Sequence, residues 1–185
     1  MDLFERGSEW RRWDLHLHTA SSYDYEYKAA DCDEILAQKL QDNSIAAVAI
    51  TDHFVIDKKR IEHLKELAPN IVFFPGVELR TDKGDTNIHV ILIFSDQSNL
   101  DELVEDFNVF KREAKDYDNN EKIYWDYNSQ ILPFAQKHNA LISIHAGRKS
   151  NGVDEKISNS LPHNQAVKSE YATTISIFEM GQVRD

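Results

Sequence analysis

Short apolar runs alternate with longer amphipathic segments along the 185 residues of this chain, and the alternation restricts the folds open to it. The apolar runs predict strands at residues 12–18, 46–51, 71–74, 88–94, 141–144 and 174–178. Apolar residues at helical spacing predict helices near residues 31–40, 58–67, 98–107 and 129–138. Strands that alternate with helices form α/β folds with parallel strands. The sequence therefore predicts a barrel or an open doubly wound sheet.

The length and composition fit one globular domain over residues 1–185. The single cysteine, Cys32, excludes an internal disulfide and favours a reducing cytoplasm. The chain has no apolar run long enough to cross a bilayer, and its first residues lack the pattern of a signal peptide. The formal net charge of −11 argues against broad electrostatic binding to nucleic acid. Carboxylates that bind divalent cations are neutralised on loading, so the net charge alone does not exclude a nucleic-acid substrate.

Residues able to bind metal ions follow directly on several apolar runs. These strand-end positions hold His16, His18, Asp52, His53, Glu78 and His145. Glu78 comes just past Pro75-Gly76, which we expect to stop the third strand, and His89 lies close to the start of its own strand. Because the carboxyl ends of parallel strands meet on one face, these side chains are expected to share one pocket.

The pair His16 and His18 has the spacing of two ligands to one metal ion, because residues i and i+2 of a strand point to the same face. Neutral imidazole binds zinc, iron and manganese, and a carboxylate such as Glu78 can bridge two metal ions. A single histidine at a strand end is more often a hydrogen-bonded polar residue than a ligand. The recurrence of possible metal ligands at successive strand ends favours a site for several metal ions.

The ordered motifs resemble those of the PHP (polymerase and histidinol phosphatase) superfamily. The similar segments are Asp14-Leu15-His16-Leu17-His18-Thr19, Ile50-Thr51-Asp52-His53, Pro75-Gly76-Val77-Glu78-Leu79, His89 and Ile144-His145-Ala146-Gly147. The resemblance implies a distorted (β/α)7 barrel that binds two or three divalent metal ions (Zn, Mn or Fe). It also implies hydrolysis of phosphomonoesters or phosphodiesters, including nucleotides and nucleic acids. Residues 7–13, 145–152 and 161–164 are similar to a subgroup in which the PHP domain precedes a large SMC/AAA-like ATPase.

The resemblance also assigns the metal ligands. They are His16, His18 and Glu78 for one ion, Glu78, His89 and His145 for a second, and His53 with Asp24 for a third. The acidic residue of the commoner pattern lies nearer the second histidine, in Ser-Asp-Gly, whereas Asp24 here stands in Ser21-Ser22-Tyr23-Asp24-Tyr25. The late Asp-x-His motif of the family has no counterpart after His145. The comparison therefore implies a barrel that is incomplete at its C-terminal end.

For the reaction, the resemblance implies hydrolysis of a phosphoester by a hydroxide that metal ions generate from water. Arg148 is the candidate for contact with the phosphate, because a guanidinium can donate hydrogen bonds to two phosphate oxygens at once. The alternative is that Arg148 is a solvent-exposed loop residue without a role in the reaction. Asp52 is expected to orient a ligand histidine or to cap the next helix. The expected partners are a phosphorylated small molecule or nucleic acid, an attached ATPase domain and a second copy of the chain. No membrane association is expected.

Two other functions stay open. The first is a metal-binding domain of low activity that regulates or scaffolds an attached ATPase, which the missing Asp-x-His motif favours. The second is an amidohydrolase-type enzyme, since such enzymes also begin with His-x-His on their first strand. Glu78 and the segment Thr51-Asp52-His53 fit the PHP pattern better.

Overall fold

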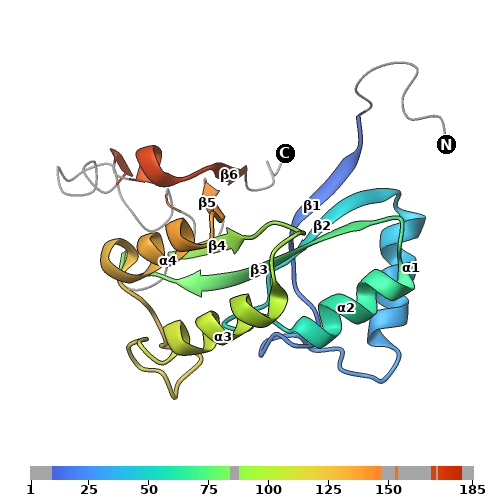
Figure 1. Cartoon of the computed structure of the whole chain (residues 1–185), viewed down its shortest axis with the longest axis horizontal. Helices are drawn as coiled ribbons and strands as arrows, with labels where there is room; N and C mark the ends of the chain where they lie inside the picture. Colours follow the sequence, from blue (N-terminus) through green and yellow to red (C-terminus); the bar gives the residue numbers. More distant parts are fainter. Residues whose placement is uncertain (1–9, 84–87, 147–152, 154–167, 170, 181–185) are drawn as a thin grey trace, which may run out of the picture.

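The computed structural model describes residues 10–83, 88–146, 153, 168–169 and 171–180. The strands are β1 (Arg12–Leu17), β2 (Ile45–Ile50), β3 (Val72–Arg80), β4 (His89–Ile93), β5 (Leu141–Ala146) and β6 (Ile177–Met180). The helices are α1 (Cys32–Asp42), α2 (Lys58–Leu67), α3 (Leu100–Lys111), the π-helical turn η1 (Tyr127–Ile131) and α4 (Leu132–Lys137). Figure 1 shows a curled sheet with α1, α2 and α3 along one side. The predicted α/β class is confirmed, and the part of the chain described here forms a half-barrel.

The six strands lie in one sheet in sequence order, but they are not all parallel as the sequence analysis expected. β1, β2 and β3 are parallel, whereas β4 runs antiparallel to both β3 and β5, and β6 is parallel to β5. The reason is the short connection between Arg80 and His89, since a parallel pair needs a crossover of a dozen residues or more. As a result, the start of β4 lies at the edge where the parallel strands end.

β3 does not stop at Pro75-Gly76, as the sequence analysis expected, but continues to Arg80. Its first half pairs with β2 as far as Pro75, and its second half pairs with β4 from Gly76 onward. Proline lacks the N–H that a continuous ladder would use, so it is tolerated where a strand changes partner. Glu78 therefore lies inside a strand, with hydrogen-bonded backbone on either side.

Side chains alternate between the two faces of each strand, and the two faces have different surroundings. The outer face packs against the helices in one large core, which includes Val48, Phe73, Val77, Leu92 and Ile144. The inner face carries a smaller apolar cluster of Ala49, Ile91 and Ile93, with Leu15, Phe74 and Ile177 packed against it. In register, Glu78 pairs with Ile91 and His145 with Glu179, so these polar side chains continue the inner face.

Local sequence signals explain where most helices begin. Asp57 accepts a hydrogen bond from the Arg60 backbone at the start of α2, and Asn99 caps α3 in the same way. The helix expected at residues 129–138 begins earlier, because Asp126 caps the π-helical turn that leads into α4. The last strand lies at Ile177–Met180 rather than at residues 174–178.

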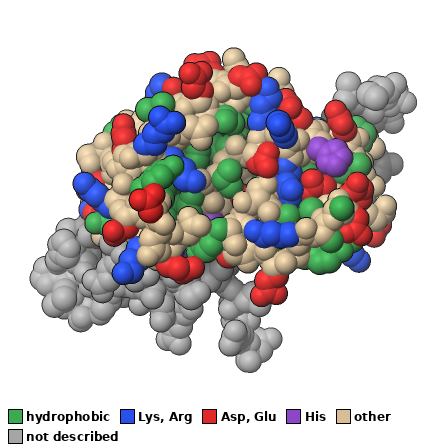
Figure 2. Space-filling view, turned by 90° about the horizontal axis from the view of Figure 1, so that it is seen from below, with side chains coloured by type: hydrophobic (Ala, Val, Ile, Leu, Met, Phe, Trp, Pro, Cys, Tyr) green, Lys and Arg blue, Asp and Glu red, His purple; other side chains and the backbone are tan. Residues whose placement is uncertain are grey.

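Charged side chains are mixed on the face that carries the helices. Figure 2 shows Lys and Arg interspersed with Asp and Glu on the side turned toward the viewer. The acidic excess therefore does not form one continuous negative field on this face. No helix within the described ranges is long and apolar enough to cross a membrane.

Gly76 is the position where the backbone has no room for a side chain. A Cβ atom there would lie 2.9 Å from the Leu92 carbonyl oxygen, 2.9 Å from Thr51 Cγ2 and 3.0 Å from the Ile50 carbonyl oxygen. We expect Gly76→Ala to lower the free energy of unfolding by about 1–3 kcal/mol, because backbone atoms of β2 and β4 must move apart. Urea denaturation in the presence of a chelator measures the change. The control Val72→Thr, at a half-exposed position of the same strand, should stay within about 0.5 kcal/mol of the wild type.

Candidate metal centre

The curled sheet gathers histidines from β1, β4 and β5 and from the turn after β2 around one buried carboxylate, Glu78. Its Oε2 atom lies 2.7 Å from His16 Nε2 and 2.8 Å from His18 Nε2. Its Oε1 atom lies 2.6 Å from His89 Nδ1 and 3.6 Å from His145 Nε2. Glu78 is only 2% exposed, so this carboxylate is surrounded by imidazoles rather than by water.

His16 and His18 point to the same place, as the i, i+2 spacing predicts. Their Nε2 atoms are 3.0 Å apart, and both face Glu78 Oε2. Two imidazole nitrogens and a carboxylate oxygen at such short mutual distances share one small space. This donor set suits a divalent metal ion, because all three atoms can present lone pairs to a common centre.

His53 enters the site from a turn after β2. The backbone N–H of Glu78 donates to the Asp52 carbonyl, and the Phe54 N–H donates to the Glu78 carbonyl, so this segment extends β2 beside β3.

Phe54, the residue after His53, adopts a left-handed backbone conformation with φ of 59°, although it is not glycine. Its buried ring packs against Tyr23 and Trp125, which compensates part of the cost of this conformation.

A second cluster of polar groups lies at the more exposed side of the site, around Asp24. Asp24 Oδ2 lies 3.3 Å from His53 Nε2, and Asp24 Oδ1 lies 3.7 Å from His18 Nδ1. The Ser22 hydroxyl donates to Asp24 Oδ1 at 2.6 Å and accepts from the His53 backbone N–H at 3.2 Å. The structure thus brings Asp24 to the histidines despite its unusual spacing in the sequence.

The described residues offer three groups whose ligand atoms lie within 4.8 Å of one another. They are His16, Glu78 and His145; His18, Asp24 and His53; and His53, Glu78 and His89. The members are the seven side chains named from the sequence, but the grouping is different. In the structure His145 joins His16, and His89 joins His53, whereas the sequence comparison placed His89 and His145 together.

Asp52 holds the backbone next to His18. Its two oxygens accept hydrogen bonds from the Thr19 backbone N–H and from the Thr19 hydroxyl, the latter at 2.6 Å. The expectation that Asp52 caps the next helix is wrong, since Asp57 occupies the N-cap of α2. Asp52 acts instead across the sheet, between the ends of β2 and β1.

Two charged residues of the centre were missed by the sequence analysis. Glu179, on β6, places its Oε2 atom 2.9 Å from both His16 Nδ1 and His145 Nδ1. The contact with His16 is a hydrogen bond, whereas the contact with His145 lacks the geometry of one. Arg80, on β3, donates from Nε to His89 Nε2 at 3.3 Å, which turns His89 Nδ1 toward Glu78. Glu179 ends the last apolar run and could have been found by the same rule as the other strand-end residues. The sequence carried no such signal for Arg80.

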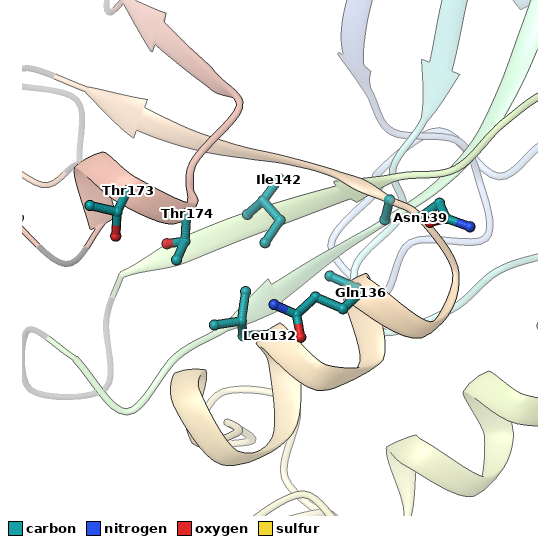
Figure 3. A pocket seen from close by; sticks show the side chains of 8 residues that line it. Leu132, Gln136, Asn139, Ile142, Thr173 and Thr174 are labelled. Carbon is teal, nitrogen blue, oxygen red and sulfur yellow. The ribbon is translucent and has the colours of Figure 1, made fainter.

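Within the part of the chain that the structure describes, no further group of metal-binding side chains adds to the centre. Arg148, the candidate for phosphate contact, lies outside the described residues, and so does nearly all of the loop expected at residues 147–162. A cavity of about 320 Å³ lies between α4, β5 and Thr173-Thr174 (Figure 3). It is lined by Leu132, Ala135, Gln136, Asn139, Ala140, Ile142, Thr173 and Thr174, so none of its lining side chains is a metal-binding histidine or carboxylate.

Burial and hydrogen bonding shift the pKa values of the central groups in different directions. Burial opposes a charge on His16, but hydrogen bonds to Glu179 and Glu78 outweigh it and raise the pKa of His16 to about 9. Burial would raise the pKa of Glu78, yet the surrounding imidazoles hold it well below its usual range. Burial dominates at His53 and lowers its pKa to about 4, so this imidazole is neutral at pH 7.

No protein-family model and no curated protein matches this chain. Solved structures that are similar to it include the following two. A protein from Bifidobacterium adolescentis named as a metal-dependent phosphoesterase aligns with a TM-score of 0.56 and 13% identity, over 91% of this chain and 77% of that one. An amidohydrolase from Chromobacterium violaceum, solved with bound sulfate and no metal, aligns with a TM-score of 0.52 and 13% identity, over 90% of this chain and 76% of that one. At this identity the similarity shows a shared fold.

The raised pKa of His16 predicts that metal ions compete with a proton. A ligand imidazole must be neutral at the nitrogen that binds, and the neutral fraction of His16 falls about tenfold for each pH unit below 9. We expect the affinity for Zn²⁺ to rise by up to about tenfold between pH 7 and pH 8. Calorimetry in buffers of different ionisation enthalpy measures the affinity and the protons released. An affinity that stays constant over this range, without proton release, would contradict the assignment.

Proposed function

We propose that this chain is a metal-dependent hydrolase that cleaves a phosphoester, in a nucleotide, a nucleic acid or a phosphomonoester. The observation that carries the proposal is the position of Glu78, whose two oxygens face different histidines. A carboxylate in this position can bridge two metal ions. The fold shared with a protein named as a metal-dependent phosphoesterase supports the same reaction class.

The residues fit the binding of divalent ions by their chemistry. His16, His18 and Glu78 present two imidazole nitrogens and a carboxylate oxygen to one point, and His53 remains neutral because its pKa is lowered to about 4. The nitrogen of His53 that faces the carboxylates of Asp24 and Glu78 is Nε2, at 3.3 Å and 3.8 Å from their oxygens. When bound, divalent ions supply a lowered pKa for an attacking water and positive charge facing the phosphate oxygens.

The protein's own side chains would fix this arrangement before a substrate arrives. Asp52 fixes the backbone beside His18 through Thr19, and Arg80 fixes the ring of His89. Asp24 is 43% exposed at its side chain, whereas that of Glu78 is 3% exposed. The substrate would therefore approach from the side of Asp24, and Glu78 would lie behind the reacting groups.

A second candidate is hydrolysis of an amide bond, which the similarity to the amidohydrolase from Chromobacterium violaceum favours. Both reactions use an activated water, so the metal ligands alone do not separate them. The substrate contacts decide between them, because a phosphate needs cationic groups facing its oxygens. A direct comparison of substrates is therefore part of the test.

We expect the chain loaded with Mn²⁺ or Zn²⁺ to hydrolyse a chromogenic phosphodiester or phosphomonoester faster than the corresponding anilide. The double variant His16→Ala, His18→Ala should lose bound metal and more than about a hundredfold of kcat. Loss of a residue that only hydrogen-bonds to a metal ligand already lowers metal affinity or activity by about 10–100-fold, so loss of two ligands should lower kcat further. Metal content is measured by mass spectrometry and turnover by absorbance.

The matched control is His63→Ala, which removes a partly exposed imidazole of α2 that contacts Asp33 of α1. It should keep metal content and turnover. Faster hydrolysis of the anilide would favour the amidohydrolase function. Stoichiometric metal without turnover of any of these substrates would favour a regulatory or scaffolding role.

A further inference from the structure

We infer that Glu179 is a positioning residue that fixes two metal ligands at once, a role that the late Asp-x-His motif of the resembled family does not describe. The inference rests on the proposed metal site and adds a residue to it. Glu179 belongs to none of the three groups of ligand atoms around Glu78. It lies on the other side of the rings of His16 and His145.

The geometry places one carboxylate oxygen behind two imidazoles. Glu179 Oε2 is 2.9 Å from His16 Nδ1 and 2.9 Å from His145 Nδ1. The opposite ring nitrogens, both Nε2, face Glu78, at 2.7 Å for His16 and 3.6 Å for His145. Each ring therefore lies between a carboxylate at its Nδ1 side and the central carboxylate at its Nε2 side.

This arrangement decides which nitrogen carries hydrogen. An ionised carboxylate can only accept, so the hydrogen bond with His16 requires the hydrogen on Nδ1. With Nδ1 protonated, the lone pair of a neutral imidazole is on Nε2, which points to the centre. A carboxylate behind a ligand histidine fixes both the tautomer and the ring orientation, and makes the ligand more basic.

Glu179 also links the two edges of the sheet. His16 belongs to β1 and Glu179 to β6, the first and last strands of the order β1 to β6. Within the described ranges β1 and β6 do not pair with each other, so the ion pair bridges the open side of the half-barrel. Glu179 thereby sets the distance between the first ligand strand and β5, which carries His145.

The test compares the full chain with the variants Glu179→Gln, His16→Ala and Glu105→Gln. Glutamine keeps the size of the side chain but removes its negative charge, and a neutral amide oxygen accepts a hydrogen bond more weakly than a carboxylate oxygen. We expect Glu179→Gln to weaken Zn²⁺ binding by about 10–100-fold, measured by competition with a chromogenic chelator. Glu105→Gln makes the same chemical change at an exposed position of α3 and should bind Zn²⁺ like the wild type.

A second measurement separates positioning from general stability. Long-range ¹⁵N–¹H spectra of the Zn²⁺-loaded protein show which ring nitrogen bears the hydrogen. We expect Nδ1–H for His16 in the wild type, and loss or faster exchange of this hydrogen in Glu179→Gln. Thermal unfolding of the metal-free proteins shows whether the variant is folded.

The outcomes distinguish this inference from the proposed function. If the wild type binds Zn²⁺, His16→Ala does not, and Glu179→Gln binds within twofold of the wild type, only the role of Glu179 is overturned. Hydrogen on Nε2 of His16 in the loaded wild type would also overturn it. If the wild type and His16→Ala both fail to bind, the metal site is wrong, and the role of Glu179 with it.

Discussion

The buried carboxylate of Glu78 is the constraint on which the candidate centre depends. A carboxylate that is 2% exposed is costly to bury unless polar partners surround it, and here imidazoles contact both of its oxygens. Those partners come from β1, β4 and β5 and from the turn after β2. The ends of these strands must therefore meet at one point, and any shift of register would leave a buried charge without its partners.

The backbone of β3 makes this meeting possible. Pro75-Gly76 marks the change of partner from β2 to β4, and Gly76 lets the neighbouring backbones approach closely. Because β4 returns antiparallel, its first residue, His89, lies at the same edge as the last residues of the parallel strands. A sheet of parallel strands alone would have placed the start of β4 at the opposite edge.

Much of the centre was predictable because most of its residues obey one rule: polar side chains follow directly on apolar runs of the sequence. That rule identified His16, His18, His53, Glu78 and His145, and the resemblance added Asp24. The same rule applies to Glu179, whereas the Asp-x-His motif of the resembled family does not occur after His145. The role of Arg80 could not be predicted, because the sequence does not show that this arginine lies beside His89 on the neighbouring strand.

The sequence by itself determined the order of the main strands and helices, the α/β class and the set of side chains available to bind metal ions, because apolar periodicity and capping act over a few residues. Only the tertiary structure decided which candidate ligand atoms lie together, with His145 beside His16 and His89 beside His53, and the contact of Glu179 with two histidines. These features depend on how strands distant in the sequence curl and pair. The physical reason is that a ligand group is defined by distances of a few ångströms between such strands, which no local pattern encodes.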